Sequence, residues 1–251
     1  MSVSIKKNLI AIGDIHGMAQ TLELLLSTLT MEFKPENTRF VFLGDLIDRG
    51  PNSSQAVDLV CDVIDYYPGS VCIRGNHDMY MDCMSSLSIA HDESTTWMCL
   101  GGKTTLESYG LDPDDLIDSG KKFNRSHPRH MSLFRNARSH FETQRYYFTH
   151  AGVDPSVPLS EQDNHVLMWI RKGFLDSTEV LEKIVVHGHT ITGSTLPEIF
   201  ENRVALDVGS YRTDKIAAAT FVDDELNGFF VGQVTASLSE VRRFDHQMNE
   251  I

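Results

Sequence analysis

The chain has 251 residues, of which 41% are hydrophobic and 23% are charged, as in ordinary globular proteins. Its formal net charge of −13 argues against binding to nucleic acid, because a general grip on phosphates requires a basic surface. The apolar runs fall well short of the ~20 residues that span a bilayer, and the run at residues 9–12 is too short for a signal-peptide core. We therefore expect one cytoplasmic domain over residues 1–251, with no membrane partner and with a monomer favoured.

Strands and helices alternate over the first 85 residues. Short apolar runs at residues 9–12, 39–43 and 70–73 predict buried strands. Leucines at helical spacing predict a helix over residues 18–29, and one apolar stripe predicts a second over residues 53–66, with Pro51 in its first turn. This order predicts parallel strands covered by helices, and hence a mixed α/β fold.

The middle of the chain, residues 79–140, is polar and poorly periodic, with turn signals such as Gly101-Gly102. It predicts helical pieces and loops that form a cap over the strand ends. Strand patterns return at residues 145–149, 184–186, 203–208, 215–222 and 228–234, with a short helix at residues 167–175. Since the last three strands are joined by short turns, they predict an antiparallel meander that forms a second sheet.

Glycine and a polar residue follow three of the early strands. Ligands bind beyond the carboxyl ends of parallel strands, so Asp14, Asp45 and Asn76 are expected to converge at one edge of the sheet. Two later strands are followed by histidine in the same way. The five segments are Gly13-Asp14-Ile15-His16-Gly17, Gly44-Asp45-Leu46-Ile47-Asp48-Arg49-Gly50, Gly75-Asn76-His77-Asp78, Phe148-Thr149-His150-Ala151-Gly152 and His187-Gly188-His189-Thr190.

One such segment alone is more often a turn or a helix cap, but five in this order favour a metal site. A mixed set of aspartate, asparagine and histidine suits manganese, iron or zinc better than calcium or magnesium. We expect one ion at Asp14, His16 and Asp45. A second ion would share Asp45 and take the remaining ligands Asn76, His150 and His189.

In this order the motifs resemble the metallophosphoesterase superfamily, and specifically its bacterial-type phosphoprotein phosphatases. Gly-Asp-x-x-Asp-Arg-Gly and Gly-Asn-His-Asp are specific together, and the resemblance runs from Gly13 to about Ala219, weakest over residues 79–140. It implies a four-layer α-β-β-α sandwich of the calcineurin-like kind. It also implies two divalent ions, manganese first and iron or zinc as alternatives, that share a hydroxide for in-line attack on phosphorus.

The resemblance also implies the roles of the remaining residues. His77 matches the general acid and Asp48 the carboxylate that orients it, while Asp78 is expected to cap the helix that follows. Arg49 matches the arginine that grips phosphate, and His189, not His187, matches the metal ligand. Further phosphate contacts are assigned to Arg171, in a Trp-x-Arg segment whose alternative interpretation is a surface arginine, and to Asn76 and Arg74.

The substrate is a phosphate ester whose identity the motifs leave open. The leading hypothesis is a serine/threonine protein phosphatase acting on phosphoproteins, and Asp48 favours it. The alternative is a dinucleoside polyphosphate (diadenosine tetraphosphate) hydrolase. A catalytically inactive binding module would lack a ligand or the acid, and neither is missing. Four apolar residues of the cap either wall a substrate groove or form the cap's own core: Trp97, Leu100, Leu106 and Tyr109.

Overall fold

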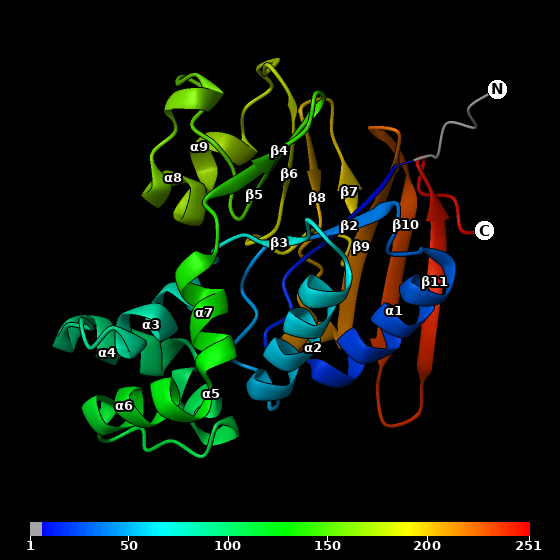
Figure 1. Ribbon diagram of the computed structural model, residues 1–251. Helices are drawn as coiled ribbons and strands as arrows, with labels where there is room; N and C mark the ends of the chain where they lie inside the picture. The colour runs from blue at the N-terminus through cyan, green and yellow to red at the C-terminus, as the bar shows by residue number, and fades with distance from the viewer. Residues whose placement is uncertain (1–6) are drawn as a thin grey trace.

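The computed structural model describes residues 7–251, so residues 1–6 of the predicted domain lie outside the described residues. Two β-sheets pack face to face, and helices cover the outer face of each sheet (Figure 1). This arrangement confirms the predicted mixed α/β fold and its four-layer α-β-β-α sandwich.

The first sheet has the strand order β11-β10-β9-β1-β2-β3. Strands β1, β2 and β3 are parallel, as predicted, whereas β9 pairs with β1 in the antiparallel sense and continues into an antiparallel meander. The bounds of the strands are β1 (Asn8–Ile12), β2 (Thr38–Phe42), β3 (Val71–Cys72), β9 (Lys215–Val222), β10 (Glu225–Val234) and β11 (Ser239–Asp245).

The second sheet has the order β4-β5-β6-β8-β7. Strands β5, β6 and β8 are parallel, and the short strands β4 and β7 pair with them in the antiparallel sense at the two edges. The bounds are β4 (His140–Glu142), β5 (Tyr146–Thr149), β6 (Ile184–His187), β7 (Glu198–Ile199) and β8 (Arg203–Ala205).

The prediction that residues 203–208, 215–222 and 228–234 form one meander is therefore wrong. Strand β8 belongs to the second sheet, while β9 and β10, together with the unpredicted β11, extend the first. The segment between β8 and β9, which holds the short helix α10 (Ser210–Thr213), crosses from one sheet to the other. A strand pattern gives no sign of this crossing, because it does not specify the neighbour with which a strand pairs.

Helices α1 (Ala19–Glu32) and α2 (Ser53–Tyr66) cover the first sheet. Helix α2 has its predicted bounds, but Pro51 lies before the helix and not in its first turn. The backbone N–H of Asn52 donates to the carbonyl of Gly17, so the helical path begins only at Ser53. On the second sheet, the predicted helix at residues 167–175 is divided into α8 (Asn164–Trp169) and α9 (Lys172–Leu175), which follow the 3-10 helix η1 (Leu159–Glu161).

Alternating side chains divide the interior into layers. In β1, Ile10 and Ile12 face α1 and α2, while Ala11 faces the second sheet. In β5, Phe148 faces the first sheet and Tyr147 faces α8 and α9. This is the two-residue period of a strand with both faces covered. Each large apolar side chain that is fully buried in these layers contributes roughly 1.5–3 kcal/mol to stability.

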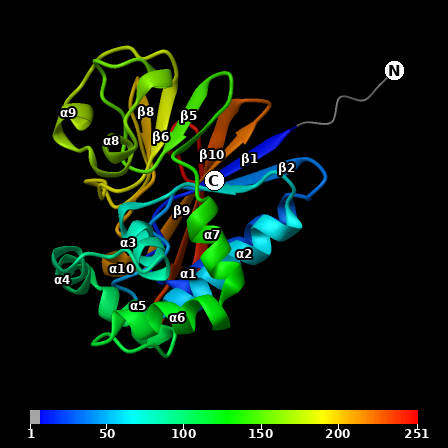
Figure 2. The ribbon, with the colours of Figure 1, turned by 60° about the vertical axis from the view of Figure 1, so that its left-hand side comes forward.

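Residues 79–140, the predicted cap, are mainly helical. Its helices gather at one end of the sandwich, beside α2 (Figure 2), and their apolar side chains join the core that underlies α1 and α2. The helices are α3 (Asn76–Ser85), α4 (His91–Leu100), α5 (Gly102–Ser108), α6 (Leu116–Ser126) and α7 (Pro128–Asn136). Within residues 7–251, every helix is too short or too polar to cross a bilayer.

Candidate metal centre

The predicted metal ligands come together where the strands of both sheets end. Asp14 and His16 follow β1, Asp45 follows β2, and Asn76 opens α3 just after β3. His150 follows β5 and His189 follows β6, from the second sheet. All of these side chains are buried, between 0% and 7% exposed. Strands that are far apart in the sequence therefore deliver polar groups to one enclosed place.

Asp45 stands between two histidine groups. Ligand atoms of His16, Asp45 and His77 lie within 4.8 Å of one another, and so do those of Asp45, His150 and His189. One carboxylate oxygen of Asp45 lies 3.6 Å from His16 Nε2, and the other lies 3.4 Å from His150 Nε2. A carboxylate whose two oxygens face different groups has the geometry of a bridging ligand. Asp14 is more distant, with Oδ2 at 4.0 Å from His16 Nε2.

The histidines present the correct ring nitrogen to the interior. His16 Nδ1 pairs with the carbonyl oxygen of Ile47 at 2.9 Å, and His150 Nδ1 pairs with that of Leu43 at 2.8 Å. A carbonyl can only accept, so Nδ1 donates its proton there and Nε2 is the ring nitrogen that faces the interior, where a cation could bind it. Among residues 7–251, Nε2 of His189 is buried without a hydrogen-bond partner. A buried nitrogen of this kind is costly unless it meets a ligand.

Glycines make room for the carboxylates. A Cβ atom on Gly75 would lie 2.2 Å from Asp45 Oδ1, and one on Gly188 would lie 2.0 Å from Asp14 Oδ1. The backbone is also strained here, because residues with side chains adopt the left-handed region at a cost of order 1–3 kcal/mol each. The predicted site residues with positive φ are His16 (47°), Asp45 (50°), Asp48 (72°), Arg49 (70°) and His189 (65°).

Burial and charge set the protonation of the cluster. Burial lowers the pKa of His16 to about 3 and that of His189 to about 2. Burial also lowers the pKa of His150, but Asp45 and Asp14 outweigh it and raise that pKa to about 10. A cation would displace the proton of His150, because the negative charge of the same carboxylates attracts both the proton and the cation. Taken together, the inward-facing Nε2 atoms, the carboxylates and the glycine cradle fit a pair of divalent cations.

Asp78 ties two segments of the site together. Helix α3 begins at Asn76, so Asp78 lies in its first turn and not before it as predicted. Asp78 Oδ2 accepts from Gly75 N, at the start of α3, at 3.0 Å and from Asp45 N at 2.8 Å. Its Oδ1 accepts from Leu46 N at 2.9 Å. Burial and the charge of Asp45 raise the pKa of Asp78 to about 6. The Asp78 side chain therefore ties the Asp45-Leu46 backbone to the first turn of α3.

His77 and Asp48 form the predicted pair. His77 Nδ1 lies 2.7 Å from Asp48 Oδ2, and neither side chain is more than 1% exposed. Burial lowers the pKa of His77, but Asp45 and Asp48 outweigh it and raise the pKa above its ordinary value. The His77 ring lies against that of His16, with centroids 4.7 Å apart, so the pair stands at the edge of the first histidine group.

The predicted phosphate-binding residues lie at different distances from the candidate metal ligands. Arg49 lies within the site, with Nη2 at 3.1 Å from His77 Nε2 and Nη1 at 3.4 Å from His16 Nε2. Arg171 lies at the rim, where Nη1 donates to Thr190 Oγ1 at 3.4 Å. Asn76 lies inside, with Oδ1 at 3.0 Å from His150 Nε2.

Arg74 is not brought to the cluster. Its guanidinium donates to the backbone carbonyl of Phe134 at 3.0 Å and lies 3.2 Å from Asp82. These partners belong to α7 and α3, so the side chain joins two helices of the cap. The nearby carboxylate and carbonyl compete for the same N–H groups that a phosphate would need.

A family model described as calcineurin-like phosphoesterase matches residues 7–214. The chain belongs to the calcineurin-like phosphoesterase family. It is 28% identical over 157 residues to a symmetrical bis(5'-nucleosyl)-tetraphosphatase of Pseudomonas syringae. That match covers 62% of the chain and 45% of the relative, so the chain spans less than half of the relative's length.

Two further likenesses extend over most of the phosphoesterase chain. The chain is 24% identical over 214 residues to serine/threonine-protein phosphatase 2 of Escherichia coli, which covers 82% of the chain and 89% of that protein. A crystal structure named as a candidate diadenosine tetraphosphatase has a TM-score of 0.59 and 19% identity, and the match covers 87% and 90% of the two chains. At this identity the structural likeness supports the shared fold alone.

Three residues beside the predicted ligands make polar contacts that the sequence did not predict. Trp97 and Thr105, from the cap, donate to Asp48. Asp207 lies buried near Asp14, and burial followed by the charge of Asp207 raises the pKa of Asp14. The signal for Trp97 is general: a buried indole N–H must find an acceptor. Asp207 lies in the segment that crosses between the sheets, so its place depends on that crossing.

Tyr211 also belongs to the surroundings of the phosphoesterase site. The guanidinium carbon of Arg49 lies 4.4 Å from the centroid of the Tyr211 ring, and this ring meets the edge of His16 at 5.3 Å. A cation over an aromatic face gains roughly 0.5–2 kcal/mol, depending on its exposure. The ring therefore packs against the guanidinium of Arg49 and against His16 at once.

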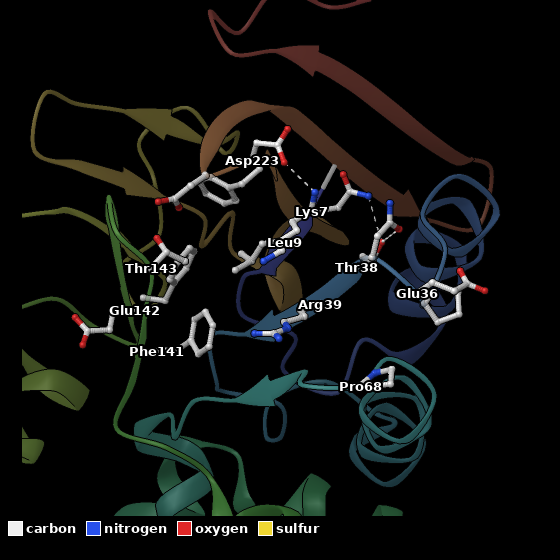
Figure 3. A pocket seen from close by; sticks show the side chains of 16 residues that line it. Lys7, Leu9, Glu36, Thr38, Arg39, Pro68, Phe141, Glu142, Thr143 and Asp223 are labelled. Carbon is white, nitrogen blue, oxygen red and sulfur yellow. Dashed lines mark hydrogen bonds between the residues drawn. The ribbon is translucent and has the colours of Figure 1, made fainter. Parts of the chain in front are cut away.

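A cavity of about 740 Å³ lies at the other end of the sandwich (Figure 3). It opens where the amino ends of β1 and β2 meet β4, and Leu9, Arg39 and Phe141 line it. It contains none of the predicted site residues. The predicted site residues gather instead at the carboxyl ends of the parallel strands, where ligands bind in α/β sheets.

Proposed function

We propose that this phosphoesterase hydrolyses phosphate monoesters with the help of two divalent cations, and that its main substrates are phosphoserine and phosphothreonine side chains of proteins. The observation that carries the proposal is the buried pair of His77 and Asp48 beside the shared carboxylate of Asp45. Manganese is the cation we favour, and the cytoplasm is the proposed location, with a monomer as the working state.

Asp14, His16 and Asp45 would hold one cation, and Asp45, Asn76, His150 and His189 the other. When bound, the cations supply positive charge that activates water and neutralises the phosphoryl oxygens. The side chains that hold them lie on strand ends with little freedom to move. Little reorganisation of the protein is then needed when charge develops on the phosphoryl group.

His77 would donate the proton that the leaving oxygen needs. Asp48 accepts from Nδ1, which directs Nε2 toward the histidine groups and stabilises the charged ring. Arg49, whose guanidinium faces both His77 and His16, would bind the phosphoryl oxygens between them. Arg171 would bind from the rim, next to Thr190. Because Arg74 is held by Asp82, we propose at most an indirect role for it.

The presence of a proton donor bears on the substrate. A serine or threonine alkoxide is a poor leaving group and requires a proton, whereas a nucleotide phosphate leaves readily as an anion. A buried, oriented histidine therefore supports the phosphomonoester over the phosphoanhydride. The second candidate, hydrolysis of dinucleoside polyphosphates, is favoured by the likeness to the Pseudomonas tetraphosphatase.

The two candidates separate in a direct comparison. The manganese-loaded protein is assayed on a panel of phosphoserine and phosphothreonine peptides and on diadenosine tetraphosphate. We expect kcat/KM for the best peptide to exceed that for the dinucleotide by at least about tenfold, which corresponds to ~1.4 kcal/mol in the barrier. A comparable advantage for the dinucleotide would reverse the assignment. A variant with His77→Asn, tested in parallel, shows whether the same donor serves both reactions.

A further inference from the structure

Asp48 receives three side-chain donors, and two of them come from the cap. Trp97 Nε1, from α4, lies 3.0 Å from each carboxylate oxygen. Thr105 Oγ1, from α5, donates to Oδ1 at 2.6 Å. His77 Nδ1 donates to Oδ2 at 2.7 Å. Asp48, Trp97 and Thr105 are all 0% exposed, so water does not compete for these bonds.

The arrangement of donors fixes the rotation of the carboxylate. The indole N–H lies equally far from both oxygens, and the threonine hydroxyl occupies the oxygen that His77 does not use. Thr105 Oγ1 also accepts from Asp48 N at 2.9 Å, so one hydroxyl holds both the backbone and the side chain of Asp48. This matters because Asp48 has a φ of 72°, a conformation that needs support from its surroundings.

The indole ring of Trp97 is packed so closely in the cap that it has little room to move. A Cβ atom on Gly102 would lie 2.7 Å from Trp97 Nε1 and 2.8 Å from its ring carbons. Gly101, with φ of 111°, passes so close to Arg49 that a Cβ there would lie 2.5 Å from Arg49 N. The two glycines at the junction of α4 and α5 therefore let the cap pack closely against Trp97 and against the backbone of Arg49.

We propose that Trp97 and Thr105 are positioning residues, through which the docked cap orients Asp48 and thereby the proton donor His77. A fully buried carboxylate needs donors for both oxygens, and charge-assisted hydrogen bonds are the strong ones. Without the cap's two donors, Asp48 would rotate toward other partners and release the His77 ring. This inference rests on the proposed function, since it concerns the proton that the leaving oxygen receives.

The first experiment measures how kcat depends on the leaving group. Trp97→Phe keeps the apolar bulk and removes the N–H, and Thr105→Val keeps the shape and removes the hydroxyl. With manganese present, we expect each to lower kcat on phenyl phosphate by about tenfold and on p-nitrophenyl phosphate by less than about threefold, because p-nitrophenolate leaves with little help from an acid. Thr105→Ser should restore the wild-type ratio of the two substrates.

The matched control is Tyr109→Phe, which removes a buried hydroxyl of the cap that bonds His130 and does not touch Asp48. It should leave the ratio of the two substrates unchanged. If Trp97→Phe and Thr105→Val lower kcat equally on both substrates, their role is only structural and the inference fails. A wild-type protein that hydrolyses neither ester would refute the proposed function instead, and the second experiment would then decide the inference alone.

The second experiment needs no turnover. The chain has two tryptophans, so the proton–nitrogen NMR spectrum of the whole protein shows two indole signals. Trp97→Phe assigns the signal of Trp97, and the other belongs to Trp169, whose ring meets the edge of His189. We expect Asp48→Asn to move the Trp97 signal upfield, since a neutral amide accepts more weakly than a carboxylate, and to leave Trp169 in place. An unmoved Trp97 signal in the folded variant would overturn the inference.

Discussion

The strand ends and the cap hold their site residues in place by different means. Asp45 and His189 stand directly behind strands, at φ of 50° and 65°, where neighbouring glycines leave room for little else. Trp97 and Thr105 stand inside the regular helices α4 and α5 and reach the site because those helices pack together. Local backbone therefore fixes the first group, and tertiary packing fixes the second. Changes at the strand ends should affect cation binding, whereas changes in the cap should affect proton donation.

The sharpest test of the strand ends is Asp45→Asn. The asparagine lacks the charge and one of the two oxygens that face His16 and His150, so we expect the protein to hold at most one cation. Losing several kcal/mol of charge stabilisation should lower kcat/KM by about 10³-fold or more. Elemental analysis after desalting measures the cation content. Asp62→Asn, at an exposed residue paired with Arg129, is the control, and two retained cations in Asp45→Asn would contradict the shared ligand.

Loss of the proton donor should lower the rate without lowering the cation content. His77→Asn removes the partner of Asp48 but none of the carboxylates, so cation content should stay at the wild-type level. We expect kcat on phenyl phosphate to fall by about 10²-fold, the lower end for a general acid, with a smaller loss on p-nitrophenyl phosphate. Steady-state kinetics on the two esters measures this. Equal losses on both, or a protein depleted of cations, would instead make His77 a ligand.

A glycine at the strand ends provides an intermediate test. In Gly188→Ala the new Cβ would lie 2.0 Å from Asp14 Oδ1, so the carboxylate must move. Overpacking of this kind costs typically ~1–3 kcal/mol, and we expect cation affinity to fall by about tenfold or more. Calorimetric titration with manganese gives the affinity. Gly193→Ala has no atom closer than 3.7 Å to its new Cβ and should bind manganese as the wild type does; if the two variants bind equally, the cradle has no effect.

The smallest effects should distinguish two arginines. Arg171 lies at the rim beside Thr190, so Arg171→Ala should raise KM for a phosphopeptide several-fold by removing a charged contact. Arg74 joins α3 and α7, so Arg74→Ala should leave KM unchanged and lower the free energy of unfolding by ~1 kcal/mol or less, because its ion pair is partly exposed. Kinetics and urea unfolding measure the two. A raised KM in Arg74→Ala would return that residue to the phosphate site.

Much of the fold could be predicted because its signals are local. The apolar runs and helical stripes of the first 85 residues correspond closely to β1, α1, β2 and α2. The pairing of β8 could not be predicted, because two short apolar strands look alike whichever sheet they join. Strands β4, β7 and β11 were missed for a related reason, since edge strands are short or exposed and carry a weak pattern.

The candidate site likewise has features that could be predicted from the sequence and features that could not. The sequence by itself determined which candidate ligands follow which strands and in what order, because a glycine, a strand end and an adjacent aspartate or histidine are neighbours along the chain. Only the tertiary structure decided which groups face each oxygen of Asp45, that Asp82 pairs with Arg74, and that Trp97 and Thr105 donate to Asp48. Contacts of this second kind join residues 8 to more than 100 positions apart, and helical spacing records only that a side chain is buried, not which polar atom it meets.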